Sequence, residues 1–240
     1  MIQNAILEFV DEESNSEENY ENLVNIIKDH KINEDPHEFK ALLQLINNIS
    51  NNHQRIYNFI NKIDQILKYF QQDIQKSFSN SEIFKVFKDN KRILLFLIQE
   101  NILLIDEYVV SQITNDENVK NKYSEYFWPE IKDFLTDEFI TKHCEKNTNL
   151  KNEEFINQIK KEKPEEFFLK RKEGENDDFL CQIIRENKVK EFGVHVSREN
   201  SSFDIFINES IYETNPLLIN NDGIKLIEYA SFFGSIEIVK

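Results

Sequence analysis

Apolar residues recur every three or four positions along most of this chain, which is the spacing of one face of an α-helix. Ser16 precedes a first clear example, in which the apolar side chains are Tyr20, Leu23, Ile26 and Ile27. Asp35-Pro36 then has the form of a helix start, with aspartate as the N-cap and proline at the first helical position. The pattern therefore predicts helices on both sides of Asp35.

The stretch from Phe39 to Phe78 contains no glycine or proline, and its apolar positions alternate in a heptad-like way. These positions are Leu42, Ile46, Ile49, Ile56, Ile60, Ile63, Leu67, Phe70 and Ile74, with His53 in the one gap. Two interpretations fit: a long helix forming a coiled-coil seam, or two antiparallel helices broken at "NNISNNHQ". We favour the two antiparallel helices for two reasons. Asparagine favours turns, and additional apolar residues make the apolar face of the helix wider than the narrow a/d face of a coiled coil.

Shorter helices are expected in the rest of the chain. Ser79 or Ser81 can cap one of them, and the two most apolar helices should meet near Asn101. Tyr126, Phe127 and Trp128 precede a proline at a helix start, and we expect them to pack in the core. After a polar turn at "KRKEGENDD", Asn176 or Asp177 is the expected next N-cap.

Composition supports an all-α fold. Only 4 glycines and 4 prolines occur among 240 residues, which is too few breakers for a turn-rich β-sandwich. The net charge of −15 disfavours nucleic acid as a partner, because phosphates would be repelled. Cys144 and Cys181 lack any metal-ligand or disulfide-framework spacing, so we expect a reducing, cytoplasmic location. No secretory signal or membrane-spanning apolar run is apparent.

An internal repeat emerges from two segments aligned without a gap. "FLCQIIRENKVKEF" at 179–192 and "LIEYASFFGSIEIV" at 226–239 share their apolar positions at an offset of 47 residues. Asn187 falls on Gly234, and "ILLFLIQENILLID" at 93–106 places Asn101 at the same position. Asparagine and glycine both tolerate the left-handed conformation that ends a helix. We predict a motif of helix, one left-handed residue, and helix, used three times.

The last stretch, "DGIKLIEYASFFGSIEIVK", resembles an ankyrin repeat. The matching residues are Asp222, Gly223, Ile227, Ala230, Gly234 and Glu237-Ile238-Val239. Lys225 to Glu228 stand where the family has Thr-Pro-Leu-His, so this would be a divergent repeat. At an ankyrin repeat's length of about 33 residues it would run past Lys240. We therefore expect Ile236, Ile238 and Val239 to lack a partner face.

The region from about residue 35 to the end is also similar to a helical region of unknown function that precedes ankyrin repeats in a large family of protist proteins. The resemblance implies an all-α fold of stacked antiparallel helix pairs, a bundle leading into an ankyrin-like solenoid. It implies two domains, an N-terminal helical domain at 1–173 and ankyrin-like helix pairs at 174–240. It implies no activity.

No catalytic motif accompanies these helices. The sequence has no glycine-rich phosphate loop and no GxSxG or HExxH motif. His143-Cys144-Glu145 are adjacent and would diverge on a helix, so we expect no metal site. No cofactor is expected, and acidic pairs such as Asp177-Asp178 should serve as helix caps. We predict a non-enzymatic scaffold that binds another protein. The alternative is a structural or regulatory subunit that self-assembles through the heptads at 42–74.

Overall fold

The computed structural model describes residues 2–12, 17–53, 58–115, 122–136, 164–199, 205–219 and 223–239. These residues form helices joined by turns and loops, with one isolated antiparallel bridge between Phe206 and Lys225. The all-α prediction is therefore confirmed. The chain divides into two compact units, Met1–Leu104 (unit 1) and Ile105–Lys240 (unit 2). The boundary expected at 173/174 lies inside unit 2 and stays a prediction.

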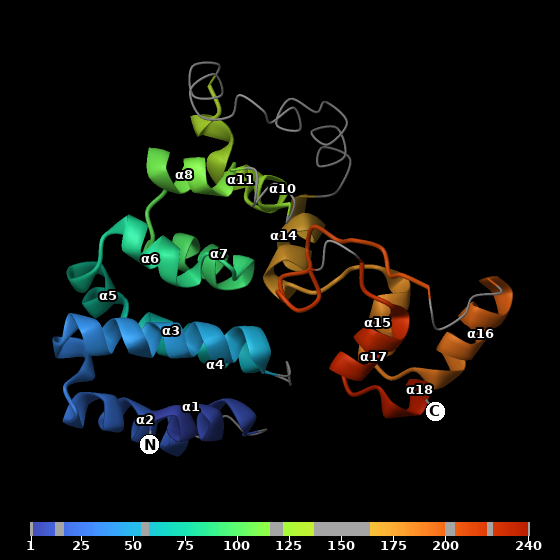
Figure 1. Cartoon of the computed structure of the whole chain (residues 1–240), viewed down its shortest axis with the longest axis horizontal. Helices are drawn as coiled ribbons and strands as arrows, with labels where there is room; N and C mark the ends of the chain where they lie inside the picture. The colour runs from blue at the N-terminus through green and yellow to red at the C-terminus, as the bar shows by residue number, and fades with distance from the viewer. Residues whose placement is uncertain are drawn as a thin grey trace. The chain divides into compact units, whose positions relative to one another are not determined.

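Unit 1 is built from packed amphipathic helices that lie in successive layers, α1 with α2, then α3 with α4, then α6 with α7 (Figure 1). Their apolar faces meet in a core rich in phenylalanine and isoleucine. The elements are α1 (Ile2–Asp11), α2 (Glu17–Asp29), the 3-10 helix η1 (Ile32–Glu34), α3 (Pro36–Asn52), α4 (Phe59–Tyr69), α5 (Gln71–Ser77), α6 (Asn80–Phe87) and α7 (Lys91–Gln99).

The heptad-like stretch is interrupted, as favoured from the sequence. Asp35 caps α3 by accepting hydrogen bonds from the backbone N–H groups of His37 and Glu38, at 2.8 and 3.1 Å. The helix ends at Asn52, and α4 begins only at Phe59, so the single long helix is wrong. His53 does not continue the apolar stripe, because it is the C-cap of α3 and its Nε2 lies 2.9 Å from the Asp11 carboxylate.

Two polar side chains tie the layers of unit 1 together, and the sequence pattern did not reveal them. The Lys62 ammonium is buried and donates to the backbone carbonyls of Phe9 and Glu12 at the end of α1. Asn90 caps α7 and also donates to Ser50 on α3. Burying a polar group costs free energy unless it is hydrogen-bonded, and both Lys62 and Asn90 make such hydrogen bonds.

Unit 2 contains the short helices α8 (Glu107–Ile113), α10 (Tyr123–Tyr126), α11 (Trp128–Ile131) and η2 (Lys132–Phe134), then α14 (Pro164–Glu173), α15 (Phe179–Arg185), α16 (Val189–Glu199), α17 (Leu226–Phe232) and α18 (Ile236–Val239). Helix α15 contacts α16 and α17, and α18 contacts α16 and α17, so two helix pairs pack on each other. Residues 205–207 form a short ladder with 224–226 beside them.

Side chains of these two helix pairs share one apolar core. Its buried members are Leu180, Cys181, Ile183, Ile184, Phe192, Leu218, Ile224, Leu226, Tyr229, Ala230 and Ile238. Ile238 is thus buried, contrary to expectation, whereas Ile236 and Val239 are 62% and 39% exposed, as expected. Tyr126 and Phe127 are also buried in unit 2, which confirms their role in packing, whereas Trp128 is only partly buried.

Membrane-spanning potential can be assessed only over the part of the chain that the structure describes. Within it, no helix combines the length and apolar character needed to cross a membrane.

Candidate functional site

Three equivalent helix ends were expected at Asn101, Asn187 and Gly234, and the structure confirms the backbone geometry at each. Their φ angles are 56°, 50° and 64°, all left-handed. Each residue donates its N–H to the carbonyl three residues earlier, and the next residue donates to the carbonyl four residues before the turn residue. This pair of bonds is the Schellman motif, which satisfies carbonyls left over at a helix end.

The path of the chain beyond the turn differs between the three sites. After Asn187 and Gly234 the second helix begins within two residues, as predicted. After Asn101 the chain continues without regular structure to Asp106, which caps α8 at Glu107. The expected helix directly after Asn101 is therefore wrong, because Leu103 leaves the helical path and donates to Leu97 instead.

The remaining residues singled out in the sequence lie near Gly234. Ala230 is fully buried, and its carbonyl accepts the hydrogen bond from Ser235 that closes the turn. Gly223 has a φ of 79°, and an added Cβ would lie 2.9 Å from the Phe206 ring. Asp222, together with Cys144 and the rest of the "HCE" cluster, lies outside the described residues.

Valine at position 234 should destabilise unit 2 by about 1 kcal/mol or more, because a β-branched residue resists positive φ. Urea unfolding followed by fluorescence of Trp128, the single tryptophan, measures this in unit 2. The matched control is Gly193→Ala in the middle of α16, where nothing lies within 4 Å of the added Cβ. That change should stabilise by about 0.5–1 kcal/mol. If both substitutions changed the free energy of unfolding equally, the left-handed conformation assigned to Gly234 would be contradicted.

The main polar feature of unit 2 begins at the loop 174–178, between α14 and α15. Asp178 caps α15 by accepting from the Leu180 N–H at 2.8 Å. The N-cap expected at Asn176 or Asp177 is therefore displaced by one or two residues. The reason is local: the Asn176 side chain accepts from the Asp178 N–H at 2.9 Å and so fixes the turn before the helix.

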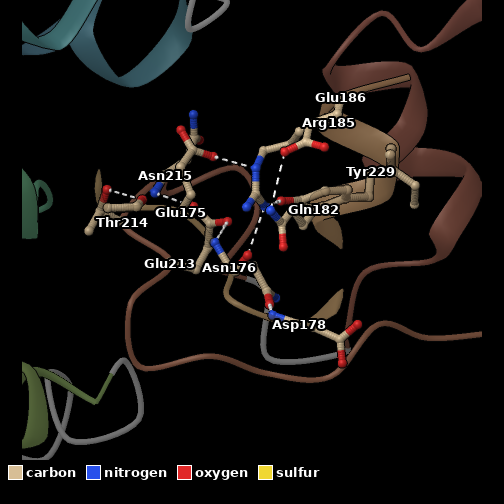
Figure 2. A network of polar contacts seen from close by, with 12 residues as sticks. Glu175, Asn176, Asp178, Gln182, Arg185, Glu186, Glu213, Thr214, Asn215 and Tyr229 are labelled. Atoms are coloured by element: carbon tan, nitrogen blue, oxygen red, sulfur yellow. Dashed lines mark hydrogen bonds and ion pairs between the residues drawn. The ribbon is translucent and has the colours of Figure 1, made fainter. Parts of the chain in front are cut away.

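Arg185 lies at the centre of a network of polar contacts beside this loop (Figure 2). Its guanidinium donates to the carbonyl of Asn176 at 2.7 Å and to the phenol oxygen of Tyr229 at 2.6 Å. Its Nε is 3.8 Å from the Glu175 carboxylate. Arg185 thus connects the end of α15, the loop and α17, so it links the first helix pair to the second.

An extended segment, residues 208–215, lies against the same loop, and we call it the strap. The Glu213 carboxylate accepts from the N–H groups of Asn176 and Asn215, at 3.3 and 2.9 Å. Thr214 donates to the Gly174 carbonyl through both its backbone N–H and its hydroxyl. The buried side chains of the strap therefore satisfy the loop's backbone rather than pointing toward solvent.

Burial dominates the electrostatics around Arg185. It raises the pKa of the Cys181 thiol to about 12, with the Asp178 charge adding to the shift. Burial, followed by the Glu213 charge, also raises the pKa of Tyr229. For Arg185, burial alone would lower the pKa, but Tyr229 and Glu175 outweigh it and the pKa is raised. At neutral pH the thiol and phenol stay protonated and the guanidinium stays charged.

A buried ion pair lies elsewhere in unit 2. Arg171 on α14 is 1% exposed, and its NH2 donates to the Glu130 carboxylate of α11 at 2.7 Å. The guanidinium also lies over the rings of Tyr126 and Phe167, at 5.2 and 5.3 Å. Burial raises the pKa of Glu130, and the neighbouring Arg171 charge offsets only part of that shift.

This arrangement is suited to holding helices together. A protonated thiol at neutral pH is a poor nucleophile, and a phenol with a raised pKa is a poor base. Over the described ranges, no group of three or more histidine, cysteine, aspartate or glutamate residues could hold a metal ion.

Sequence reasoning missed Arg171, Arg185, Glu213 and Tyr229 as key contacts. Arg185 directly follows the buried run Ile183-Ile184, and its counterpart at the offset of 47 is Phe232. A cation at an apolar position of a repeat was the available signal. For Arg171 there was none, because it stands in the polar run "KRKEGEN", which is typical of a solvated turn.

No protein-family model, no curated protein and no solved structure matches this chain. The resemblance to ankyrin repeats and to the helical region of protist proteins therefore stays a prediction.

Proposed function

We propose that this chain is a non-enzymatic scaffold that binds another protein through the helix pairs of unit 2. The observation that carries the proposal is where large apolar side chains are exposed. Within the described residues of unit 1 only Tyr69 and Leu104 are exposed in this way. The other members of this class belong to unit 2: Phe168, Leu169, Phe179, Val189, Val194, Phe206, Leu217, Ile236 and Val239.

Several of these residues lie on the two packed helix pairs. Phe179 begins α15, Val189 and Val194 are on α16, and Ile236 and Val239 are on α18. Contiguous patches of exposed apolar side chains mark protein-interaction surfaces, and we propose that these side chains form such a patch. We infer that α15–α16 and α17–α18 are two repeats of the ankyrin type, because they share an offset of 47 residues and the same Schellman turn.

The nature of the partner is argued from charge and chemistry. A net charge of −15 favours a protein over nucleic acid as the partner. The proposal includes no cofactor and no membrane contact. The proposed location is the reducing cytoplasm, with which the buried free thiol of Cys181 is compatible.

The alternative, self-assembly through the heptads at 42–74, has less support. The described apolar positions of that pattern that unit 1 buries include Leu42, Ile46, Ile49, Ile63, Leu67, Phe70 and Ile74. A stripe buried inside its own unit offers little apolar surface to a second chain. We therefore favour the scaffold.

The test uses photo-crosslinking residues placed at 194 or 236 in the full chain, in cells that express it. We expect a discrete adduct with one protein from each position, and Ile236→Glu or Val194→Glu should abolish co-purification of that protein. The matched control is Leu104→Glu, an equally exposed apolar position of unit 1, 54% exposed. The proposal fails if neither position gives an adduct, or if only the control change abolishes binding.

A further inference from the structure

The strap, residues 208–215, is fixed at both ends by contacts outside the loop that it covers. On one side, Ile207 donates to the Ile224 carbonyl and Leu226 donates to Ile205, at 2.8 and 2.9 Å. On the other side, a turn begins at Asn215, whose carbonyl accepts from Leu218, a buried residue. Movement of the strap between these two ends would leave both attachments intact.

Between its ends the strap is bound to the loop 174–178 mainly by hydrogen bonds. Asn208 accepts from the Asn176 side chain and donates to Asp178, both at 2.8 Å. Thr214 and Glu213 bond to Gly174 and Asn176 farther along. Tyr212 is the strap's one buried large apolar side chain, and it packs on Phe167 at 5.8 Å between centroids. Because a hydrogen bond contributes little net free energy, such a segment can open locally.

Ser210 lies beside a charged group of the loop. Its hydroxyl donates to Asp177 at 2.7 Å and accepts from the Tyr212 N–H at 3.0 Å. Lys170 is the cation beside it, and it is already shared between Asp177 and Glu166, each at 3.2 Å. The neighbouring Glu209 is paired with Lys122 at 3.0 Å. A negative charge introduced at position 210 would therefore face Asp177 and would have to share Lys170 with Asp177 and Glu166.

We propose that the strap is a latch that opens locally between its fixed ends, that the hydrogen bond from Ser210 to Asp177 helps to hold it closed, and that a negative charge introduced at position 210 makes it open more often. Opening uncovers the Gly174 carbonyl and the Asn176 amide groups, to which the strap is hydrogen-bonded. The latch thus controls solvent access to the polar network of Figure 2. This inference does not depend on the proposed scaffold function.

Amide hydrogen exchange on the full chain tests the latch. The N–H groups of Thr214 and Asn176 donate across the contact between strap and loop, so they report opening. The N–H groups of Ile207 and Leu226 report the ladder at one fixed end. In the unmodified protein, Thr214 should exchange faster than Leu226 and with less dependence on urea. Identical rates and urea dependence at Thr214 and Leu226 would overturn the proposal.

Three variants separate charge from the loss of a hydroxyl. Ser210→Asp should speed exchange at Thr214 by at least about tenfold relative to Ser210→Ala, through repulsion by Asp177. Adding Asp177→Asn to Ser210→Asp should restore slow exchange. The matched control, Ser197→Asp, adds the same charge on the exposed side of α16, where the Ser197 hydroxyl donates to the Gly193 carbonyl of the same helix. Equal exchange in Ser210→Asp and Ser210→Ala, or an equal effect of Ser197→Asp, would refute the latch.

Discussion

Replacing Arg171 with methionine should destabilise unit 2 by about 3 kcal/mol, because breaking a buried ion pair leaves an uncompensated charge. The charge left behind is the Glu130 carboxylate, 2.7 Å from the guanidinium in the native protein. Urea unfolding followed by Trp128 fluorescence measures the loss of unfolding free energy, because Trp128 lies in unit 2 as the first residue of α11.

Two further measurements separate this explanation from simple loss of packing. The double change Arg171→Met with Glu130→Met should recover most of the lost free energy, because an apolar pair can replace a buried ion pair at little cost. The pH dependence provides the second. Burial already raises the pKa of Glu130, and removing Arg171 removes the opposing effect. When a carboxyl has a higher pKa in the folded than in the unfolded protein, the free energy of unfolding falls as the pH rises above the pKa of the unfolded state.

The defect of Arg171→Met should therefore be smaller at pH 5 than at pH 7, since Glu130 can then bind a proton. A defect of the same size at both pH values, with no recovery in the double variant, would show that Arg171 acts through packing alone.

Replacing Tyr229 with alanine should cost unit 2 about 3–5 kcal/mol, the range for removing a large buried aromatic side chain. Tyr229 is fully buried in the core shared by the two helix pairs, where its ring lies 4.8 Å from that of Phe233. Its hydroxyl accepts from Arg185 at 2.6 Å. The same fluorescence-detected unfolding gives the change in free energy.

The matched change Tyr229→Phe keeps the ring and removes only the hydroxyl. It should cost about 1–2 kcal/mol, because the guanidinium of Arg185 loses one buried acceptor. If phenylalanine costs as much as alanine, the hydrogen bond rather than packing carries the stabilisation. If neither change affects unfolding, Tyr229 does not connect the helix pairs.

The helices themselves could be predicted because their signals are local. Asp35-Pro36 marks a helix start, and asparagine or glycine at 101, 187 and 234 marks helix ends, since each residue type acts on its own backbone. The break after Asn52 followed from the same local chemistry. By contrast, the delayed start of α8 depends on where Leu103 packs, which the repeat alignment could not reveal.

The polar contacts of the candidate site could not be predicted for a different physical reason. Arg171 and Glu130 are 41 residues apart in sequence, and Arg185 and Tyr229 are 44 apart. A charged residue signals burial only through a partner that neutralises it, and the sequence does not say which residue that is. The same holds for Glu213, which belongs to a segment without helical or strand periodicity.

The buried Lys62 has a consequence for synthesis on the ribosome. Its ammonium satisfies the carbonyls of Phe9 and Glu12 at the end of α1, across 53 and 50 residues of sequence. Chains grow at about 5–20 residues per second, so the cap becomes available roughly 3–10 s after these carbonyls are made. A helix of 10 residues is marginal by itself in water. We therefore expect the C-terminal end of α1 to be capped only after Lys62 of α4 has been made, although α2 is available to pack on α1 earlier.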